Sequence, residues 1–276
     1  MYAGIDVGGT KTLAAVLDDN GTILEQSKFP TPQKYDDFIS QLANTVASFA
    51  TSEFTALGVA LPVTSFDRQR GIAHSFGNLP WRNEPVQRDF ERLFSCPVVI
   101  ENDAKLGGLS EAMLLKDKYQ KVLYITVSTG IGTALIVNQT IDTAIGDAGG
   151  RLLLLEYKGK LTPWEKFASG KAIVERFGHR AEDIHDAATW KRIAHDLALG
   201  FIELIALLEP EIIVVGGSVG TYYDRYSTYL AAELKQLETP LLTLPPIIGA
   251  QRPEEAVVYG CYDLAKATYG THTQPA

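Results

Sequence analysis

Glycine-rich turns follow three apolar segments of the chain, and each turn carries polar groups that suit phosphate binding. The first turn, Asp6-Val7-Gly8-Gly9-Thr10-Lys11, combines an acid, two glycines, a hydroxyl and a cation. The second is Ser128-Thr129-Gly130-Ile131-Gly132, and the third is Gly216-Gly217-Ser218. Glycine lets the backbone approach a ligand closely and direct N–H groups toward it. A single turn of this kind is as readily explained by a plain β-turn, whereas three in this setting predict a nucleotide site.

Asp6 stands at the end of an apolar segment, directly before the first pair of glycines. Carboxylate oxygens are the ligands that Mg²⁺ prefers, and this ion keeps several of its waters. We therefore expect Asp6 to hold Mg²⁺ directly or through water, with Thr10 and Lys11 adding a hydroxyl donor and a charge. The turn is neither a P-loop nor a dinucleotide fingerprint, because the chain has no G-x-x-x-x-G-K-[ST] and no G-x-G-x-x-G that opens a helix.

A second carboxylate, Asp103, follows the apolar segment Val98-Val99-Ile100 and begins a predicted helix. The dipole at a helix N-terminus favours a carboxylate there. Asp103 can therefore serve as a helix cap or as a base that accepts a proton, and the two roles are compatible. Taken alone, Asn78 reads as a turn residue and Glu165 as a solvated charge at a helix start.

The elements that must position these residues alternate along the chain. Predicted strands are 2–7, 12–17, 22–29, 57–61, 97–100, 121–127, 133–137 and 211–215. Predicted helices are 35–50, about 84–94, about 190–208 and about 255–268. The unit of strand, glycine turn and strand occurs near residue 8 and again near residue 130, which indicates two related mixed α/β domains that face each other.

Composition limits the partners and the compartment. The chain has 276 residues, is 46% hydrophobic and carries a net charge of −8, which disfavours a nucleic-acid backbone as partner. Two cysteines, Cys96 and Cys261, provide neither a disulfide framework nor a four-cysteine zinc site, and we expect buried thiols in a reducing cytoplasm. The N-terminus shows no secretory signal, and the longest apolar segments are too short to span a bilayer, so no membrane partner is expected.

At this point the chain resembles the ROK family (repressors, open reading frames and kinases) of the actin-like ATPase superfamily. The resemblance rests on motifs that occur in the family's order over nearly the whole chain. These are Gly4 to Lys11, Gly77 to Trp81, Glu101 to Ala104, Ser128 to Gly132, Glu165 to Gly170 and Val215 to Gly217.

The resemblance implies a fold and roles for individual residues. The fold is two α/β lobes of the ribonuclease-H type, residues 1–107 plus 262–276 and residues 108–261, with the active site in the cleft between them. Asp103 is then the catalytic base, and Gly216-Gly217 contacts adenosine. The implied sugar contacts are Asn78, Asn102, Asp103, Asp147 and Glu165.

The chain departs from the family after the second glycine turn. Most relatives carry Glu-x-Gly-His there, followed by zinc-binding cysteines, whereas this chain has Asp147-Ala148-Gly149-Gly150 and lacks all the zinc-binding cysteines. We expect no zinc, and we expect packing around Trp164 to replace it. The lost contacts leave the acceptor sugar open, unless Arg151 or Glu156 supplies new ones.

The function implied is ATP- and Mg²⁺-dependent transfer of phosphate to a hydroxyl of a hexose or a related sugar, with polyphosphate open as the donor. Because relatives often dimerise, a homodimer is also open. The alternative is a sugar- and nucleotide-binding protein with little or no turnover that acts as a sensor. A repressor is disfavoured because the first glycine turn starts at residue 6, and an actin-like structural ATPase because Asn78 and Asn102-Asp103 would lack a purpose.

Overall fold

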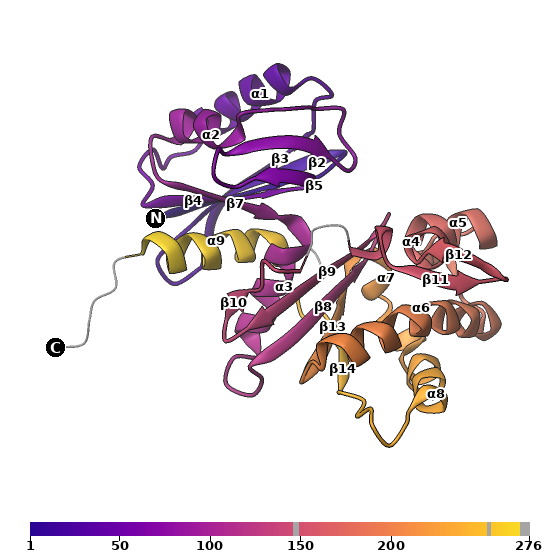
Figure 1. Cartoon of the computed structure of the whole chain (residues 1–276). Helices are drawn as coiled ribbons and strands as arrows, with labels where there is room; N and C mark the ends of the chain where they lie inside the picture. Colours follow the sequence, from indigo (N-terminus) through magenta and orange to yellow (C-terminus); the bar gives the residue numbers. More distant parts are fainter. Residues whose placement is uncertain (146–148, 253–254, 271–276) are drawn as a thin grey trace. The chain divides into compact units, whose positions relative to one another are not determined.

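The computed structural model describes residues 1–145, 149–252 and 255–270. The chain divides into two compact units (Figure 1): unit 1 is Met1–Ser110 with Glu255–Ala276, and unit 2 is Glu111–Glu254. The elements of unit 1 are β1 (Tyr2–Val7), β2 (Lys11–Leu17), β3 (Ile23–Pro30), α1 (Tyr35–Ala47), β4 (Ala56–Leu61), β5 (Val63–Asp67), β6 (Ile72–Phe76), α2 (Val86–Phe94), β7 (Val98–Asn102) and α9 (Ala256–Tyr269). Helix α3 (Asp103–Leu114) crosses the division between the units.

The main sheet of unit 1 has the order β3-β2-β1-β4-β7. Strands β1 to β3 are antiparallel, while β1, β4 and β7 run parallel. Helices α1 and α2 cover one face and α9 covers the other, as Figure 1 shows. Helix α9 lies close to the strands because Gly58 meets the Cys261 carbonyl, where an added Cβ would come within 2.1 Å. The parallel strands therefore end at one edge of a sheet that is buried on both faces.

Unit 2 repeats this topology. Its elements are β8 (Lys121–Val127), β9 (Ile131–Val137), β10 (Thr140–Ile141), β11 (Leu154–Tyr157), β12 (Lys160–Pro163), α4 (Glu165–Ala168), α5 (Gly170–Phe177), α6 (Ala187–Leu208), β13 (Ile212–Gly216), α7 (Gly217–Gly220), α8 (Ser227–Leu237) and β14 (Ile247–Gly249), with short 3₁₀ turns at Gly149–Arg151, Ala181–Asp183 and Tyr223–Arg225. The sheet order β10-β9-β8-β13-β14 again joins an antiparallel meander to parallel strands. The mixed α/β class and the internal repeat are thus as the sequence predicted.

Capping residues and prolines explain where the helices begin and end. Helix α1 buries Tyr35, Phe38 and Leu42 at helical spacing. Helix α2 begins at Val86, two residues later than predicted, because Pro85 occupies the N-cap. Helix α6 begins behind Asp186, whose carboxylate accepts the Thr189 N–H at 2.7 Å.

Several segments differ from the sequence-based expectation. The second glycine turn is shorter than expected, because Ile131 and Gly132 already pair with β8. The hairpin β5-β6 and the hairpin β11-β12 were not anticipated as strands. The expected lobe limits, 107/108 and 261/262, fall inside α3 and α9, whereas the compact units divide at 110/111 and 254/255.

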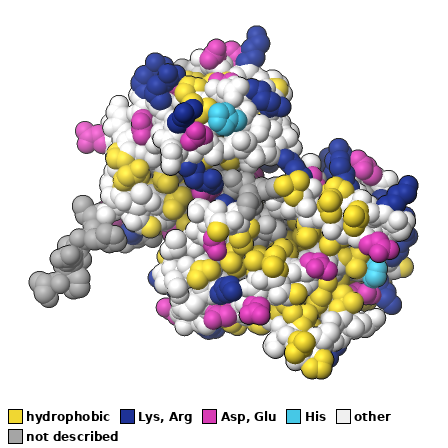
Figure 2. Space-filling view, in the orientation of Figure 1, with side chains coloured by type: hydrophobic (Ala, Val, Ile, Leu, Met, Phe, Trp, Pro, Cys, Tyr) yellow, Lys and Arg dark blue, Asp and Glu magenta, His cyan; other side chains and the backbone are white. Residues whose placement is uncertain are grey.

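Charged side chains of both signs are interspersed on the face of the molecule drawn in Figure 2, and on that face the Lys and Arg side chains form no continuous stripe. Among the described residues, no helix is long and apolar enough to cross a membrane.

Candidate active site

The first glycine turn joins β1 to β2 and is held by contacts with Lys11, Thr31 and Asn78. The Gly8 N–H donates to the Lys11 carbonyl at 3.0 Å, which closes the turn. Thr31, directly after β3, donates its hydroxyl to the Gly8 carbonyl at 2.8 Å and its N–H to the Thr10 carbonyl at 3.0 Å. Gly9 leaves no room for a side chain, because an added Cβ would lie 2.7 Å from Cβ of Asn78. The turn and Asn78 are therefore in contact, as a shared site requires.

Asp6 and Asp103 lie near each other at the edge where the parallel strands of unit 1 end. Asp6 on β1 pairs with Ala60 on β4, and Ala60 pairs with Glu101 on β7, two residues before Asp103. Dense surroundings of protein atoms, and secondly the charge of Asp103, raise the pKa of Asp6 from 3.8 to about 7. Because burial and the charge of Asp103 disfavour the ionised form of Asp6, a cation beside Asp6 would stabilise that form.

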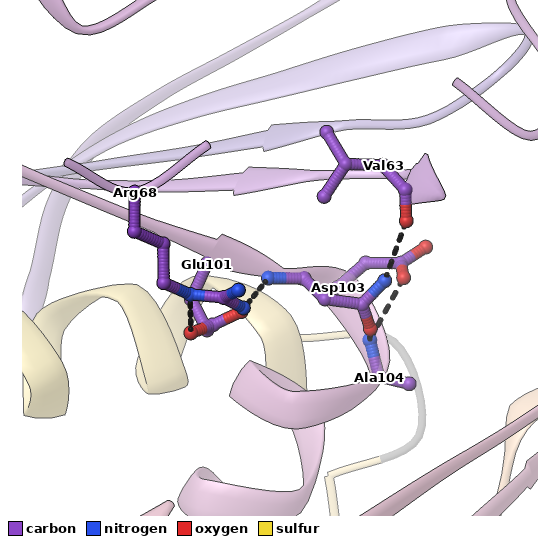
Figure 3. Close-up of polar contacts among 6 residues, drawn as sticks. Val63, Arg68, Glu101, Asp103 and Ala104 are labelled. Atoms are coloured by element: carbon purple, nitrogen blue, oxygen red, sulfur yellow. Dashed lines mark hydrogen bonds and ion pairs between the residues drawn. The ribbon is translucent and has the colours of Figure 1, made fainter. Parts of the chain in front are cut away.

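The junction between β7 and α3 sets the position of Asp103 (Figure 3). The Ala104 N–H, in the first turn of the helix, donates to the side-chain oxygens of Asn102 at 3.0 Å and Asp103 at 2.8 Å. The Asn102 amide donates in turn to the Val63 carbonyl at 3.2 Å. Asn102, the residue before α3, thus provides the side-chain cap of the helix, and Asp103 is its first residue. The Asp103 side chain is only partly buried, which is compatible with a role as base. Both polar atoms of the buried Asn102 side chain therefore form hydrogen bonds to backbone groups.

An ion pair that the sequence did not reveal lies beside this junction. Arg68, in the turn between β5 and β6, donates to both carboxylate oxygens of Glu101, at 3.1 Å and 2.5 Å. The same Glu101 side chain accepts the Asn102 N–H at 2.8 Å. Its three donors fix Glu101, so this third acid at the strand ends is already paired.

The second glycine turn, between β8 and β9, contacts Glu165. The Glu165 carboxylate accepts the Ile131 N–H at 3.2 Å, and its Oε2 would lie 2.3 Å from a Cβ added to Gly130. Arg151 lies 3.6 Å from the other oxygen of Glu165. Unit 2 therefore brings its predicted sugar contact directly against its predicted phosphate turn, and it adds a guanidinium to the pair.

Ser128 joins the second glycine turn to the third. Its hydroxyl accepts the Ser218 N–H at 3.2 Å, and its carbonyl accepts the Gly170 N–H at 2.6 Å. Gly217 has a φ of 82° and would place a Cβ 2.6 Å from the Ser128 hydroxyl. Glycine is needed there both for its backbone conformation and for this close approach. Sequence patterns show Ser128 only as a flank of the turn.

The segment in which most relatives carry the zinc site is built without clustered metal ligands in the described part of the chain, where no group of three His, Cys, Asp or Glu side chains could hold a metal. Gly150 packs flat on β9, since an added Cβ would lie 2.8 Å from Ile131. Trp164, after β12, is fully buried and donates its indole N–H to the Asp196 carbonyl at 3.1 Å. Asp147, a predicted sugar contact, lies outside the described residues.

Each unit thus assembles its own share of the predicted residues. Unit 1 gathers Asp6, the first glycine turn, Asn78, Asn102 and Asp103. Unit 2 gathers the second and third glycine turns with Glu165.

Comparison with known proteins identifies the family of this chain. The profile of the ROK family matches residues 2–268. A glucokinase of Streptomyces coelicolor is 25% identical over 310 residues, which cover 96% of this chain and 98% of that protein.

Solved structures share the fold. A ROK family glucokinase from Streptomyces griseus in complex with glucose and AMPPNP matches with a TM-score of 0.80 at 22% identity, over 96% of this chain and 99% of that one. An inorganic polyphosphate/ATP-glucomannokinase from Arthrobacter sp. strain KM matches with a TM-score of 0.70 at 27% identity, over 94% and 96%. Because the family profile spans nearly all of the sequence, this chain belongs to the ROK family.

Proposed function

We propose that this protein is an ATP-dependent sugar kinase in which Asp103 is the general base. The observation that carries the proposal is the pair of carboxylates in unit 1: Asp103 at a helix N-terminus, close enough to raise the pKa of Asp6 beside the first glycine turn. A base and a metal-binding acid next to a phosphate-binding turn are the parts that phosphoryl transfer to a hydroxyl needs. The S. coelicolor relative is a glucokinase, which supports a sugar as acceptor.

Phosphate binding falls to the glycine turns. In unit 1, the backbone of Gly9 and Thr10, the Thr10 hydroxyl and the exposed Lys11 would hold phosphate oxygens. In unit 2, Thr129 and the turn from Gly130 to Gly132 would do the same, and Gly216-Gly217 would lie along the adenosine. Backbone N–H groups and a lysine stabilise the charge that develops during transfer.

Asp6 fits a Mg²⁺ ion, held directly or through water, because this cation takes one or two carboxylates and completes its shell with water and substrate phosphates. Bound near Asp6, Mg²⁺ would offset the charge of the phosphates. The raised pKa of Asp6 agrees with such a role, since burial and the charge of Asp103 disfavour its ionised form and a bound cation would favour it.

In unit 1, Asn78 and Asn102 would bind the acceptor, and Asp103 would accept the proton of the attacking hydroxyl. In unit 2, Glu165 is the candidate sugar contact. The 3.2 Å bond from the Ile131 N–H to Glu165 has a consequence for the donor. A phosphate oxygen and a carboxylate cannot share one N–H without repulsion, so Glu165 must leave this N–H before phosphate uses it. Sugar hydroxyls are suitable new partners for Glu165.

Two features of the substrates follow from this site. Arg151 and Glu165 place donors beside an acceptor, which suits neighbouring hydroxyls of a neutral sugar. Polyphosphate is a second candidate donor, because the glucomannokinase relative is named for both polyphosphate and ATP.

A panel of hexoses, N-acetylated hexosamines and related sugars, assayed with MgATP by coupled ADP detection, tests the proposal. We expect sugar-dependent ADP release and a phosphorylated sugar with at least one member. ADP release that no sugar stimulates, together with the absence of a phosphosugar from ATP or polyphosphate, would reject it in favour of a ligand-binding sensor.

A further inference from the structure

Arg68 is an arginine of the β5-β6 turn that reaches into the strand ends of unit 1. Its Nε and Nη2 bind the two oxygens of Glu101 at 3.1 Å and 2.5 Å. Glu101 is only 5% exposed, whereas the Arg68 side chain keeps 37% of its surface exposed. Two parallel N–H···O bonds to a buried carboxylate fix the orientation of both groups.

Glu101 passes this constraint to the Glu101–Asn102 peptide, which lies one residue ahead of Asp103. Its Oε1, which Arg68 binds, also accepts the Asn102 N–H at 2.8 Å. The Asn102 side chain holds the other side of the junction, through the Val63 carbonyl and the Ala104 N–H. The β5-β6 hairpin therefore contacts the β7-α3 junction through two residues, Val63 and Arg68, and Figure 3 shows both.

Charge gives the ion pair a second consequence. Asp6, Glu101 and Asp103 are three acids at one edge of the sheet, and Asp6 and Glu101 both pair with Ala60 from opposite sides. Arg68 supplies a positive charge to this group at Glu101. Without Arg68, the buried Glu101 carboxylate would lose its two bonds from the guanidinium and keep the bond from the Asn102 N–H. The carboxylate would then turn toward other donors.

From this geometry we infer that Arg68 is a positioning residue for the catalytic base: acting through Glu101, it fixes the Glu101–Asn102 peptide and so the start of α3, which directs Asp103 to the acceptor hydroxyl. The inference rests on the proposed function of Asp103. Arg68 touches no reacting atom in this scheme, and its effect comes from geometry, where displacement of a reacting group by about 1 Å can lower a rate about 100-fold.

The kinetic test compares Arg68→Met with Arg70→Met. Arg70 lies on the same turn, and its side chain is 75% exposed and lies 3.8 Å from the Asp67 carboxylate, so it is a matched control. We expect Arg68→Met to lower kcat at least 10-fold with KM for ATP within 2-fold, and Arg70→Met to change neither. Arg68→Lys should restore part of kcat, because a lysine keeps the charge and one of the two bonds.

A double-mutant cycle shows whether Arg68 acts through Glu101. In the Glu101→Gln background, Arg68→Met should lower kcat by less than 2-fold further, because the partner is already altered. Multiplicative losses in the double variant, or an unchanged kcat in a folded Arg68→Met protein, would overturn the inference.

Amide hydrogen exchange provides a readout that does not depend on turnover. In ¹⁵N-labelled protein, Arg68→Met should speed exchange of the Asn102 and Ala104 N–H groups at least 10-fold, and Arg70→Met should leave both unchanged. Equal protection of these two amides in Arg68→Met and the unaltered chain would overturn the inference. If the unaltered chain phosphorylates no sugar, the proposed function fails, while the exchange result still decides whether Arg68 holds the junction.

Discussion

Replacement of Asp6 by asparagine should stabilise the ligand-free protein, and more so at high pH. Asp6 belongs to the buried end of β1, where desolvation and the charge of Asp103 raise its pKa from 3.8 to about 7. The folded chain therefore binds a proton at Asp6 more tightly than the unfolded chain does. The contribution of protonated Asp6 to the free energy of unfolding is fully present below about pH 4. It falls as pH rises toward 7 and is lost above pH 7.

The size of the effect follows from the shift. Each unit of pKa corresponds to about 1.36 kcal/mol, so a shift of about 3 units lowers the free energy of unfolding by up to about 4 kcal/mol above pH 7. Between pH 5 and pH 8 the change is about 3 kcal/mol, because the first part is already lost at pH 5. The asparagine has no charge to desolvate and should lack this dependence.

Urea unfolding of the unaltered chain and of Asp6→Asn at pH 5 and pH 8, without Mg²⁺, measures the difference. We expect the advantage of Asp6→Asn to grow by about 3 kcal/mol from pH 5 to pH 8. Asp37→Asn, on the exposed side of α1, serves as control and should show no such growth. Mg²⁺ added at pH 8 should stabilise the unaltered chain and leave Asp6→Asn unchanged. An advantage that is independent of pH, or that grows as pH falls, would refute the reasoning.

Three further changes test other parts of the account. Glu165→Gln should raise KM for the sugar and strengthen binding of a nonhydrolysable ATP analogue measured without sugar, because a neutral amide no longer opposes phosphate at the Ile131 N–H; weaker analogue binding would contradict this. Trp164→Ala should lower the free energy of unfolding by about 3–5 kcal/mol, since it empties a fully buried site against Gly200 and Phe201; a loss below about 1 kcal/mol in urea unfolding would show that the packing there is not needed. Chelation of zinc should leave the melting temperature unchanged, and zinc at one ion per chain in the purified protein would disprove the idea that packing replaces the metal.

The elements that sequence patterns predicted are those with one dominant local signal. Strands β1 and β2 are apolar segments, and β3 follows a strong turn signal at residues 18–21. Helix α6 carries apolar residues at helical spacing between Asp186 and Pro210. The β5-β6 hairpin escaped prediction because its pairing is irregular between Val63 and Phe66 and its strands mix exposed and buried positions. Helix α8 was not predicted either, because its apolar pattern is weak: Leu230 and Leu234 are its buried residues.

The candidate site shows the same limit. The glycine turns and Asn102-Asp103 are contiguous motifs, and each can be recognised locally. Thr31 and Arg68 act on residues that are far away in the sequence, Gly8 at a separation of 23 and Glu101 at 33. No local pattern links such partners, because folding alone brings them together. Ser128 shows a related case, since its hydroxyl serves Ser218 at a separation of 90.

The role of Asp103 is tested most directly by Asp103→Asn, measured with a sugar that the unaltered chain phosphorylates. Removal of a general base costs about 10²- to 10⁴-fold in rate. We expect kcat to fall by at least 100-fold, with affinity for the ATP analogue within 2-fold and the circular dichroism spectrum unchanged. A folded Asp103→Asn protein that turns over sugar at a near-normal rate would contradict the assignment.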